Sequence, residues 1–147
     1  MVKIEISGDG KFSPVGVSEI RRIIKKAAKV LGRDNFQIDV CLVKEREIIR
    51  LNKKFRGKNN PTTVLSFIQS DGFVYPKNFL NHKGEIFLNF SSIKKEAKIY
   101  NIPIKDYAIK ILIHGFLHLM SFGHNNARNK AIMEKKEKEI LSKIFND

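Results

Sequence analysis

The chain has 147 residues, of which 42% are hydrophobic, so it is long enough to bury the core of one domain. Its 28 Lys and Arg residues against 15 Asp and Glu residues give a net charge of +13 at pH 7, which favours polyanionic partners, nucleic acid before anionic membranes. The single cysteine excludes an internal disulfide. The basic residues are spread along the chain, 15 in residues 1–75 and 13 in residues 76–147, so a lysine-rich solvated surface is the alternative.

In chain order, the hydrophobic pattern predicts a strand over residues 2–7, a helix that Ser18 caps and Gly32 ends, a strand over 36–43, and a short helix over 44–55. Strands over 62–67 and 85–90 follow, with His82 solvated in the turn between them. Ser91 or Ser92 then caps a helix to about residue 100, Pro103 precedes an apolar helix, and an amphipathic helix spans 127–145, with Ile132 among its inward side chains. This mixture predicts an α+β fold: one domain over residues 1–147, with helices packed on a small mixed sheet of about four strands.

The N-terminal residues lack the apolar stretch of a signal peptide. The longest apolar segment, residues 109–122, is shorter than the ~20 residues that span a bilayer, and it contains two histidines and a lysine. Cys41, in an apolar run, reads as a small core residue in a reducing compartment. We therefore expect a cytoplasmic protein with no membrane partner.

Three of the four histidines lie within eleven residues of the apolar helix and its end, at His114, His118 and His124. Histidines four residues apart lie on one helix face, and Gly123 is expected to let the chain turn and return His124 as a third ligand. Three nitrogens leave a fourth tetrahedral position for water, which is typical of a catalytic zinc site with one Zn²⁺ per chain. Copper or nickel would also bind such a set, and buried histidines satisfied by hydrogen bonds are the alternative.

Metalloproteases carry a glutamate directly after the first histidine, as the general base, but this chain has Gly115 there. The central apolar helix therefore has a zincin-like ligand spacing without the zincin base, and peptide hydrolysis is disfavoured. A glycine within a helix costs about 1 kcal/mol relative to alanine, so we expect a neighbouring backbone or the substrate to approach closely at this position.

Two further segments suit an anionic substrate. Arg56 ends the polar helix before a glycine and a proline-led strand, where its guanidinium group can face a phosphate, although most surface arginines are only solvated. Aromatic and basic residues alternate over 73–79, so Tyr75 and Lys77 are candidates for base stacking and phosphate pairing. The alternative is a loop whose aromatic residues anchor it to the core.

The motif Leu-Asn-x-x-Phe-Arg-x-Lys-x-x-Pro-Thr-x-Val-Leu-Ser-Phe from Leu51, followed by His-Gly-Phe-Leu-His-Leu and a third histidine, resembles the YbeY family of ribosomal RNA maturation endoribonucleases. The resemblance covers nearly the whole chain. It implies a zinc-dependent endoribonuclease for single-stranded RNA that acts at the 3′ end of small-subunit ribosomal RNA and in ribosome quality control. It further implies that His114, His118 and His124 are the metal ligands and that Arg56 takes part in activity. We therefore expect His114 and Arg56 to be catalytic, and Arg56, Lys58, Tyr75 and Lys77 to contact the substrate.

Three positions where the family usually has acidic side chains differ here: Gly123, Thr63 and Asn59. With these candidate bases missing, we expect water or hydroxide on the zinc ion to act while Arg56 stabilises charge on the phosphate, and Glu85 or Glu134 are the remaining acidic candidates. A non-catalytic basic module that binds RNA or the ribosome, with a vestigial metal site, is the second hypothesis. A metallopeptidase is the third.

Overall fold

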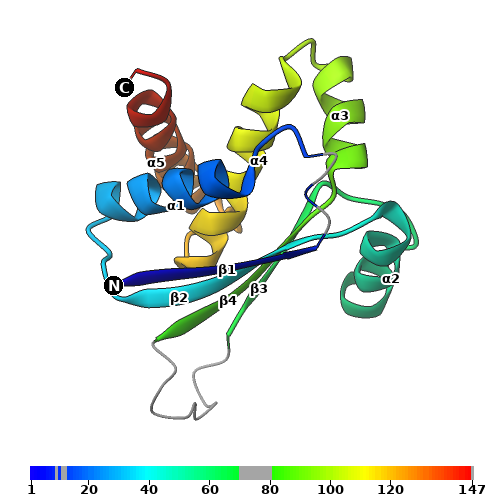
Figure 1. Ribbon diagram of the computed structural model, residues 1–147, viewed down its shortest axis with the longest axis horizontal. Helices are drawn as coiled ribbons and strands as arrows, with labels where there is room; N and C mark the ends of the chain where they lie inside the picture. Colours follow the sequence, from blue (N-terminus) through cyan, green and yellow to red (C-terminus); the bar gives the residue numbers. More distant parts are fainter. Residues whose placement is uncertain (9, 11–12, 70–80, 147) are drawn as a thin grey trace.

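The computed structural model describes residues 1–8, 10, 13–69 and 81–146. Its elements are, in chain order, β1 (Val2–Gly8), α1 (Val17–Val30), β2 (Phe36–Leu42), α2 (Glu45–Arg56), β3 (Val64–Ile68), β4 (His82–Leu88), α3 (Phe90–Ile99), α4 (Ile104–Leu119) and α5 (Ala127–Phe145). Within the described residues, the strands form a four-stranded sheet in the order β1-β2-β4-β3, and β3 runs antiparallel to β4 (Figure 1). The expected α+β class with one small mixed sheet is confirmed.

Helices α1, α3, α4 and α5 cover one face of the sheet, with α4 at the centre (Figure 1). Successive side chains of a strand point to opposite faces, so Ile86 and Leu88 of β4 reach this helical layer. From α4, Leu112, Ile113 and Phe116 are almost fully buried in the same core. A helix that is apolar around most of its circumference is stable only when other elements surround it. This explains why α4 lies at the centre of the helical layer.

Helix α2 packs against the opposite face of the sheet. Its buried Ile48 and Leu51 form a second, small core with Leu65 of β3. Gly57 ends the helix in the left-handed conformation, at φ +70°, and the buried Asn52 donates a hydrogen bond of 2.9 Å to the carbonyl oxygen of Asn60. These contacts hold the C-terminal end of α2 beside β3, which is the outer strand of the sheet.

Several predicted boundaries and placements were wrong. Helix α1 begins at Val17, and its N-cap Gly16 has no side chain to accept a hydrogen bond, so Ser18 is no cap. Strand β4 begins at His82, whose ring lies 3.0 Å from the carboxylate of Asp39 and is 7% exposed, rather than in a solvated turn. Ile132 of α5 is 45% exposed and does not point into the core.

The cap of α3 is Asn89, not Ser91 or Ser92. Its side-chain oxygen accepts a hydrogen bond of 2.9 Å from the backbone amide of Ser92, and its amide group donates to the carbonyl oxygen of Val43 at 3.0 Å. Asn89 therefore begins the helix and also ties it to the end of β2.

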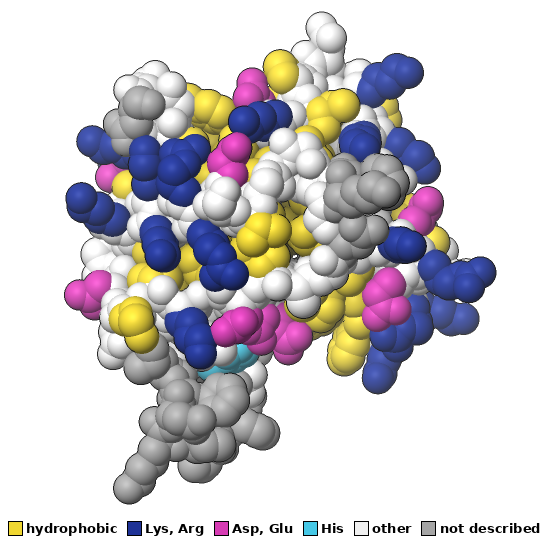
Figure 2. All heavy atoms as spheres, in the orientation of Figure 1, with side chains coloured by type: hydrophobic (Ala, Val, Ile, Leu, Met, Phe, Trp, Pro, Cys, Tyr) yellow, Lys and Arg dark blue, Asp and Glu magenta, His cyan; other side chains and the backbone are white. Residues whose placement is uncertain are grey.

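Figure 2 shows Lys and Arg side chains distributed over the visible face, with Asp and Glu between them. On this face the positive charge is not confined to one patch. Among the helices of the described residues, none combines the length and apolar character that a bilayer crossing requires.

Candidate metal centre

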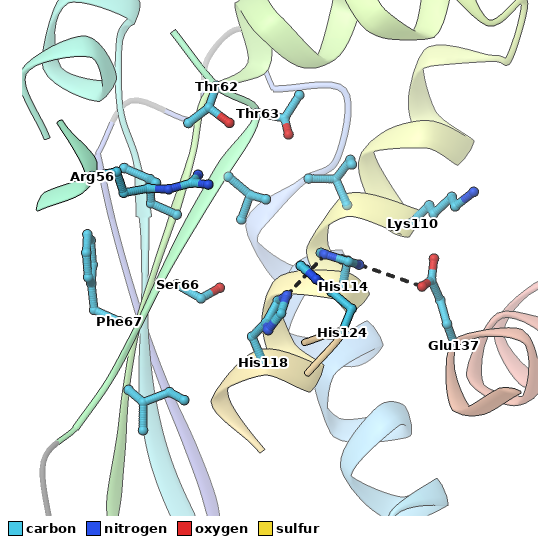
Figure 3. A pocket seen from close by; sticks show the side chains of 14 residues that line it. Arg56, Thr62, Thr63, Ser66, Phe67, Lys110, His114, His118, His124 and Glu137 are labelled. Atoms are coloured by element: carbon cyan, nitrogen blue, oxygen red, sulfur yellow. Dashed lines mark hydrogen bonds and ion pairs between the residues drawn. The ribbon is translucent and has the colours of Figure 1, made fainter. Parts of the chain in front are cut away.

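His114 and His118 lie on the face of α4 that points away from the core, one turn apart (Figure 3). Their Nε2 atoms face each other at 3.2 Å. The spacing of four residues produces this geometry, because side chains at i and i+4 lie above one another on a helix.

The turn after α4 places His124 beside the other two rings. The backbone amides of Ser121 and Phe122 donate to the carbonyl oxygens of His118 and Leu117, at 3.1 and 3.0 Å, the hydrogen-bond pattern of a Schellman motif. Ser121 occupies the left-handed position of this motif, with φ +72°. The expectation that Gly123 makes the turn was wrong, because the helix already ends at Leu119 and the chain reverses two residues before the glycine.

The donor set fits a single metal ion. The ligand nitrogens of the three histidines all lie within 4.8 Å of one another. Nitrogens bound to one tetrahedral zinc ion lie about 3.4 Å apart, close to the separation between His114 and His118. Burial, reinforced by the neighbouring His114 and His124, lowers the pKa of His118 and favours the neutral imidazole, the form that binds a metal. A metal ion satisfies all three nitrogens at once.

The three histidines line a cavity of about 530 Å³ between α4 and β3 (Figure 3). Arg56, from the end of α2, lies in the wall opposite them and points its guanidinium group into the cavity. Arg56 and His114 are 58 positions apart in the sequence, and the packing of α2 and α4 on either side of β3 brings them to one cavity. An anion placed between them would meet the guanidinium group on one side and, with a metal ion on the histidines, a second cation on the other.

Besides Arg56, the predicted substrate contacts are Lys58, Tyr75 and Lys77. Lys58 is exposed and is not among the residues that line this cavity, while Tyr75 and Lys77 lie outside the described residues. Of the two positions near Arg56 where the family usually has acidic side chains, Thr63 lines the cavity and Asn59 does not. Within the described residues, therefore, Arg56 is the predicted substrate contact that the fold brings to the histidines.

The two acidic candidates, Glu85 and Glu134, lie in different places relative to the histidines. Glu85 alternates with Ile86, which faces α4, so it points to the opposite face of the sheet from the histidines. Glu134 is exposed and lines a neighbouring cavity of about 340 Å³ between α4 and α5, which His114 and His124 also line. Neither side chain lines the cavity that contains both Arg56 and the histidines.

The acidic side chain that does reach this cavity is Glu137 of α5, which sequence reasoning missed. One of its carboxylate oxygens lies 3.7 Å from Nδ1 of His114, and its side chain is 11% exposed (Figure 3). A signal was present in the sequence: position 137 falls on the buried stripe of Met133, Ile140 and Ile144. A carboxylate on an apolar stripe requires a partner, and here the partner is a histidine.

Gly115 packs against the sheet. A Cβ atom at this position would lie 3.0 Å from Val64, 3.1 Å from the hydroxyl of Ser66 and 3.2 Å from Ile86. The Ser66 hydroxyl also donates a hydrogen bond of 3.0 Å to the Gly115 carbonyl oxygen. The close approach comes from side chains of the sheet, not from a backbone or the substrate.

We expect Gly115→Glu, which restores the metalloprotease sequence, to lower the free energy of unfolding by at least about 2 kcal/mol, because the carboxylate has no space or partner against β3 and β4. Urea denaturation followed by circular dichroism measures this. Lys110→Glu, on the exposed surface of the same helix, is the control and should change stability by less than about 1 kcal/mol. Equal stability of the two variants would contradict the packing described here.

The family model described as endoribonuclease YbeY matches residues 11–145. The chain belongs to the endoribonuclease YbeY family. The endoribonuclease YbeY of Syntrophus aciditrophicus is 31% identical over 140 residues, which cover 94% of this chain and 87% of the relative. That of Finegoldia magna is 33% identical over 131 residues, covering 86% and 84%. The solution structure of TM1509 from Thermotoga maritima is 28% identical, with a TM-score of 0.66 over 99% of this chain and 90% of that one.

Membership of the YbeY family confirms the resemblance drawn from the sequence motifs and the prediction of an endoribonuclease, a hydrolase that acts on RNA. The fold of TM1509 extends over the whole sheet and its helices, so the α+β architecture is shared with a solved structure. The three-histidine group is compatible with metal binding in this family.

Proposed function

We propose that this protein is a zinc-dependent endoribonuclease that cleaves single-stranded RNA during maturation of the 3′ end of small-subunit ribosomal RNA and in ribosome quality control, in the cytoplasm. The observation that carries the chemistry is the shared cavity, in which three converging histidines face Arg56. The family supports RNA as the substrate. The net charge of +13 supports a polyanionic partner, ribosomal RNA within the small subunit.

In this proposal His114, His118 and His124 hold one zinc ion per chain. A bound zinc ion supplies Lewis acidity and lowers the pKa of a water ligand towards ~7. Arg56 binds the phosphodiester from the opposite wall and stabilises the negative charge that develops on its oxygens. The fixed end of α2 orients the guanidinium group, and Asn52 holds that end through its hydrogen bond to Asn60.

Glu137 positions His114 in this scheme. A carboxylate beside Nδ1 favours the tautomer that carries its proton there, which leaves Nε2 free to bind the metal. Because the side chain is largely buried between α4 and α5, it also restricts rotation of the ring. We therefore treat Glu137 as a positioning residue that acts through His114.

We expect Glu137→Gln to weaken zinc binding about 10- to 100-fold while the metal-free protein melts at nearly the same temperature, because the amide is isosteric but lacks the charge. Competition with a chelator of known affinity measures the zinc dissociation constant. Glu139→Gln, two residues later, is the matched control, because Glu139 is exposed and lines neither cavity; this variant should bind zinc like the wild type. If both variants bind zinc as tightly as the wild type, Glu137 does not position His114.

Incubating the purified protein with a single-stranded oligoribonucleotide tests the proposed function. Internal cleavage that a chelator abolishes and zinc restores is the expected result. A protein that binds the oligonucleotide but never cleaves it, with or without zinc, would instead be the basic binding module. Hydrolysis of casein without cleavage of RNA would indicate a metallopeptidase.

A further inference from the structure

Phe55, directly before Arg56, is an aromatic side chain that the core does not enclose. It is 56% exposed on the last turn of α2, and Ile68 of β3 is 57% exposed. The Phe55 ring lies against the Phe67 ring, with centroids 4.9 Å apart, and Phe67 packs on Phe87 at 5.6 Å. Two buried or half-buried rings thus support a third ring that faces solvent.

This aromatic surface lies on the α2 face of the sheet, opposite the histidines, and reaches the edge strand β3 that borders the cavity of the metal centre. Phe67, Ile68 and Arg56 all line the cavity that the three histidines share (Figure 3). Phe55 and Arg56 are consecutive at the end of α2, but their side chains point in different directions: Arg56 points into the cavity and Phe55 lies beside Phe67. A single strand that passes over the edge strand β3 can reach both side chains. The surface and the metal centre can therefore be occupied by one continuous ligand.

A cationic side chain lies over the exposed ring, and two more belong to the same end of α2 and the turn after it. The ammonium group of Lys54 lies 5.2 Å from the centre of the Phe55 ring, and Lys53 and Lys58 are exposed nearby. In Figure 2, Lys and Arg side chains gather beside hydrophobic side chains over α2. An exposed aromatic ring between cations is the arrangement by which proteins hold unpaired nucleic acid strands, since the ring stacks on a base while the cations pair with the backbone.

We infer that Phe55 and Phe67, with Lys54, form a stacking site for an unpaired nucleobase next to the phosphodiester that is cleaved. The inference rests on the proposed function, and it explains why the enzyme would prefer single-stranded RNA. A base within a duplex is already stacked on both faces and cannot lie on Phe55. The site recognises the face of the base, so it is tolerant of sequence.

The chain contains no tryptophan, so Phe55→Trp introduces a single fluorophore at the stacking surface. In stopped-flow mixing, before turnover, a single-stranded oligoribonucleotide of about eight nucleotides should quench its emission, and a duplex of the same sequence should quench it far less. Phe145→Trp, at a 50% exposed phenylalanine near the end of α5, is the matched control and should not respond. Equal quenching of both tryptophans, or none in either, would overturn the site.

Steady-state kinetics give a second, independent readout. Phe55→Ala should raise KM for single-stranded RNA about tenfold and leave kcat within about threefold, while Phe55→Tyr, which keeps the ring, should behave like the wild type. If the wild type cleaves RNA and Phe55→Ala has an unchanged KM, the aromatic rings serve only to pack α2 on the sheet. That result would overturn the stacking site but not the proposed function. A wild type that neither binds nor cleaves RNA would overturn both.

Discussion

Replacing His114 by alanine is expected to abolish metal binding and to lower the rate of RNA cleavage by at least about 10³-fold. His114 supplies one of three converging nitrogens, and two histidines hold zinc much more weakly than three. The loss of a catalytic metal removes several kcal/mol of transition-state stabilisation, and each 1.36 kcal/mol corresponds to a factor of ten in rate. Plasma mass spectrometry of protein purified without chelator should give about one zinc per wild-type chain and almost none in His114→Ala.

The fourth histidine provides the control for this experiment. His82 lies on β4, next to Asp39, and it is not among the residues of the metal-centre cavity. We expect His82→Ala to retain one zinc per chain and to cleave RNA at nearly the wild-type rate per folded molecule. Zinc that persists in His114→Ala, or disappears equally in His82→Ala, would contradict ligation by the three-histidine group.

Replacing Arg56 by alanine is expected to lower kcat for RNA cleavage about 10²- to 10³-fold without changing the zinc content. The guanidinium group points into the cavity from the wall opposite the histidines, so it can reach a phosphate but does not contribute a metal ligand. Removing one preorganised donor from a site of developing negative charge costs about this factor. Arg56→Lys should recover only part of the loss, because an ammonium group cannot form the paired hydrogen bonds of a guanidinium group.

Lys58→Ala separates this specific role from a general effect of charge. Lys58 is exposed two residues after Arg56 and does not line the cavity, so its removal takes away the same charge from nearly the same region. The variant should show a modest rise in KM that disappears at high salt, with kcat unchanged. A similar loss of kcat in both variants would mean that Arg56 acts only through long-range attraction.

The elements that could be predicted from the sequence are those whose local pattern and tertiary environment agree. The range expected for α5, 127–145, is the observed one, because an asparagine cap and an amphipathic pattern both mark it. The histidine pair of α4 follows from the helical repeat alone. The order of the strands in the sheet has no such local signal, since it depends on pairing between distant segments.

Three of the errors share a physical cause, because each involves a contact between segments distant in sequence. Asn89 caps α3, and its amide group also donates a hydrogen bond to the carbonyl oxygen of Val43, which is distant in sequence. From the local sequence alone, Ser91 or Ser92 was the better candidate for the cap. His82 lies in a strand because β4 pairs with β2, which places its ring against Asp39. Glu137 was missed because its partner, His114, belongs to another helix.

The division of the three histidines between α4 and the turn after it determines how the metal and the fold depend on each other. The helix that carries His114 and His118 is held by the core on its other sides, and hydrogen bonds within the backbone already close the turn before His124. Little chain entropy is left for a metal ion to remove, unlike in zinc fingers, which unfold without their metal. If the protein holds zinc as proposed, we therefore expect it to acquire and release the metal as a folded molecule, so that removing the metal would not expose the chain to proteolysis.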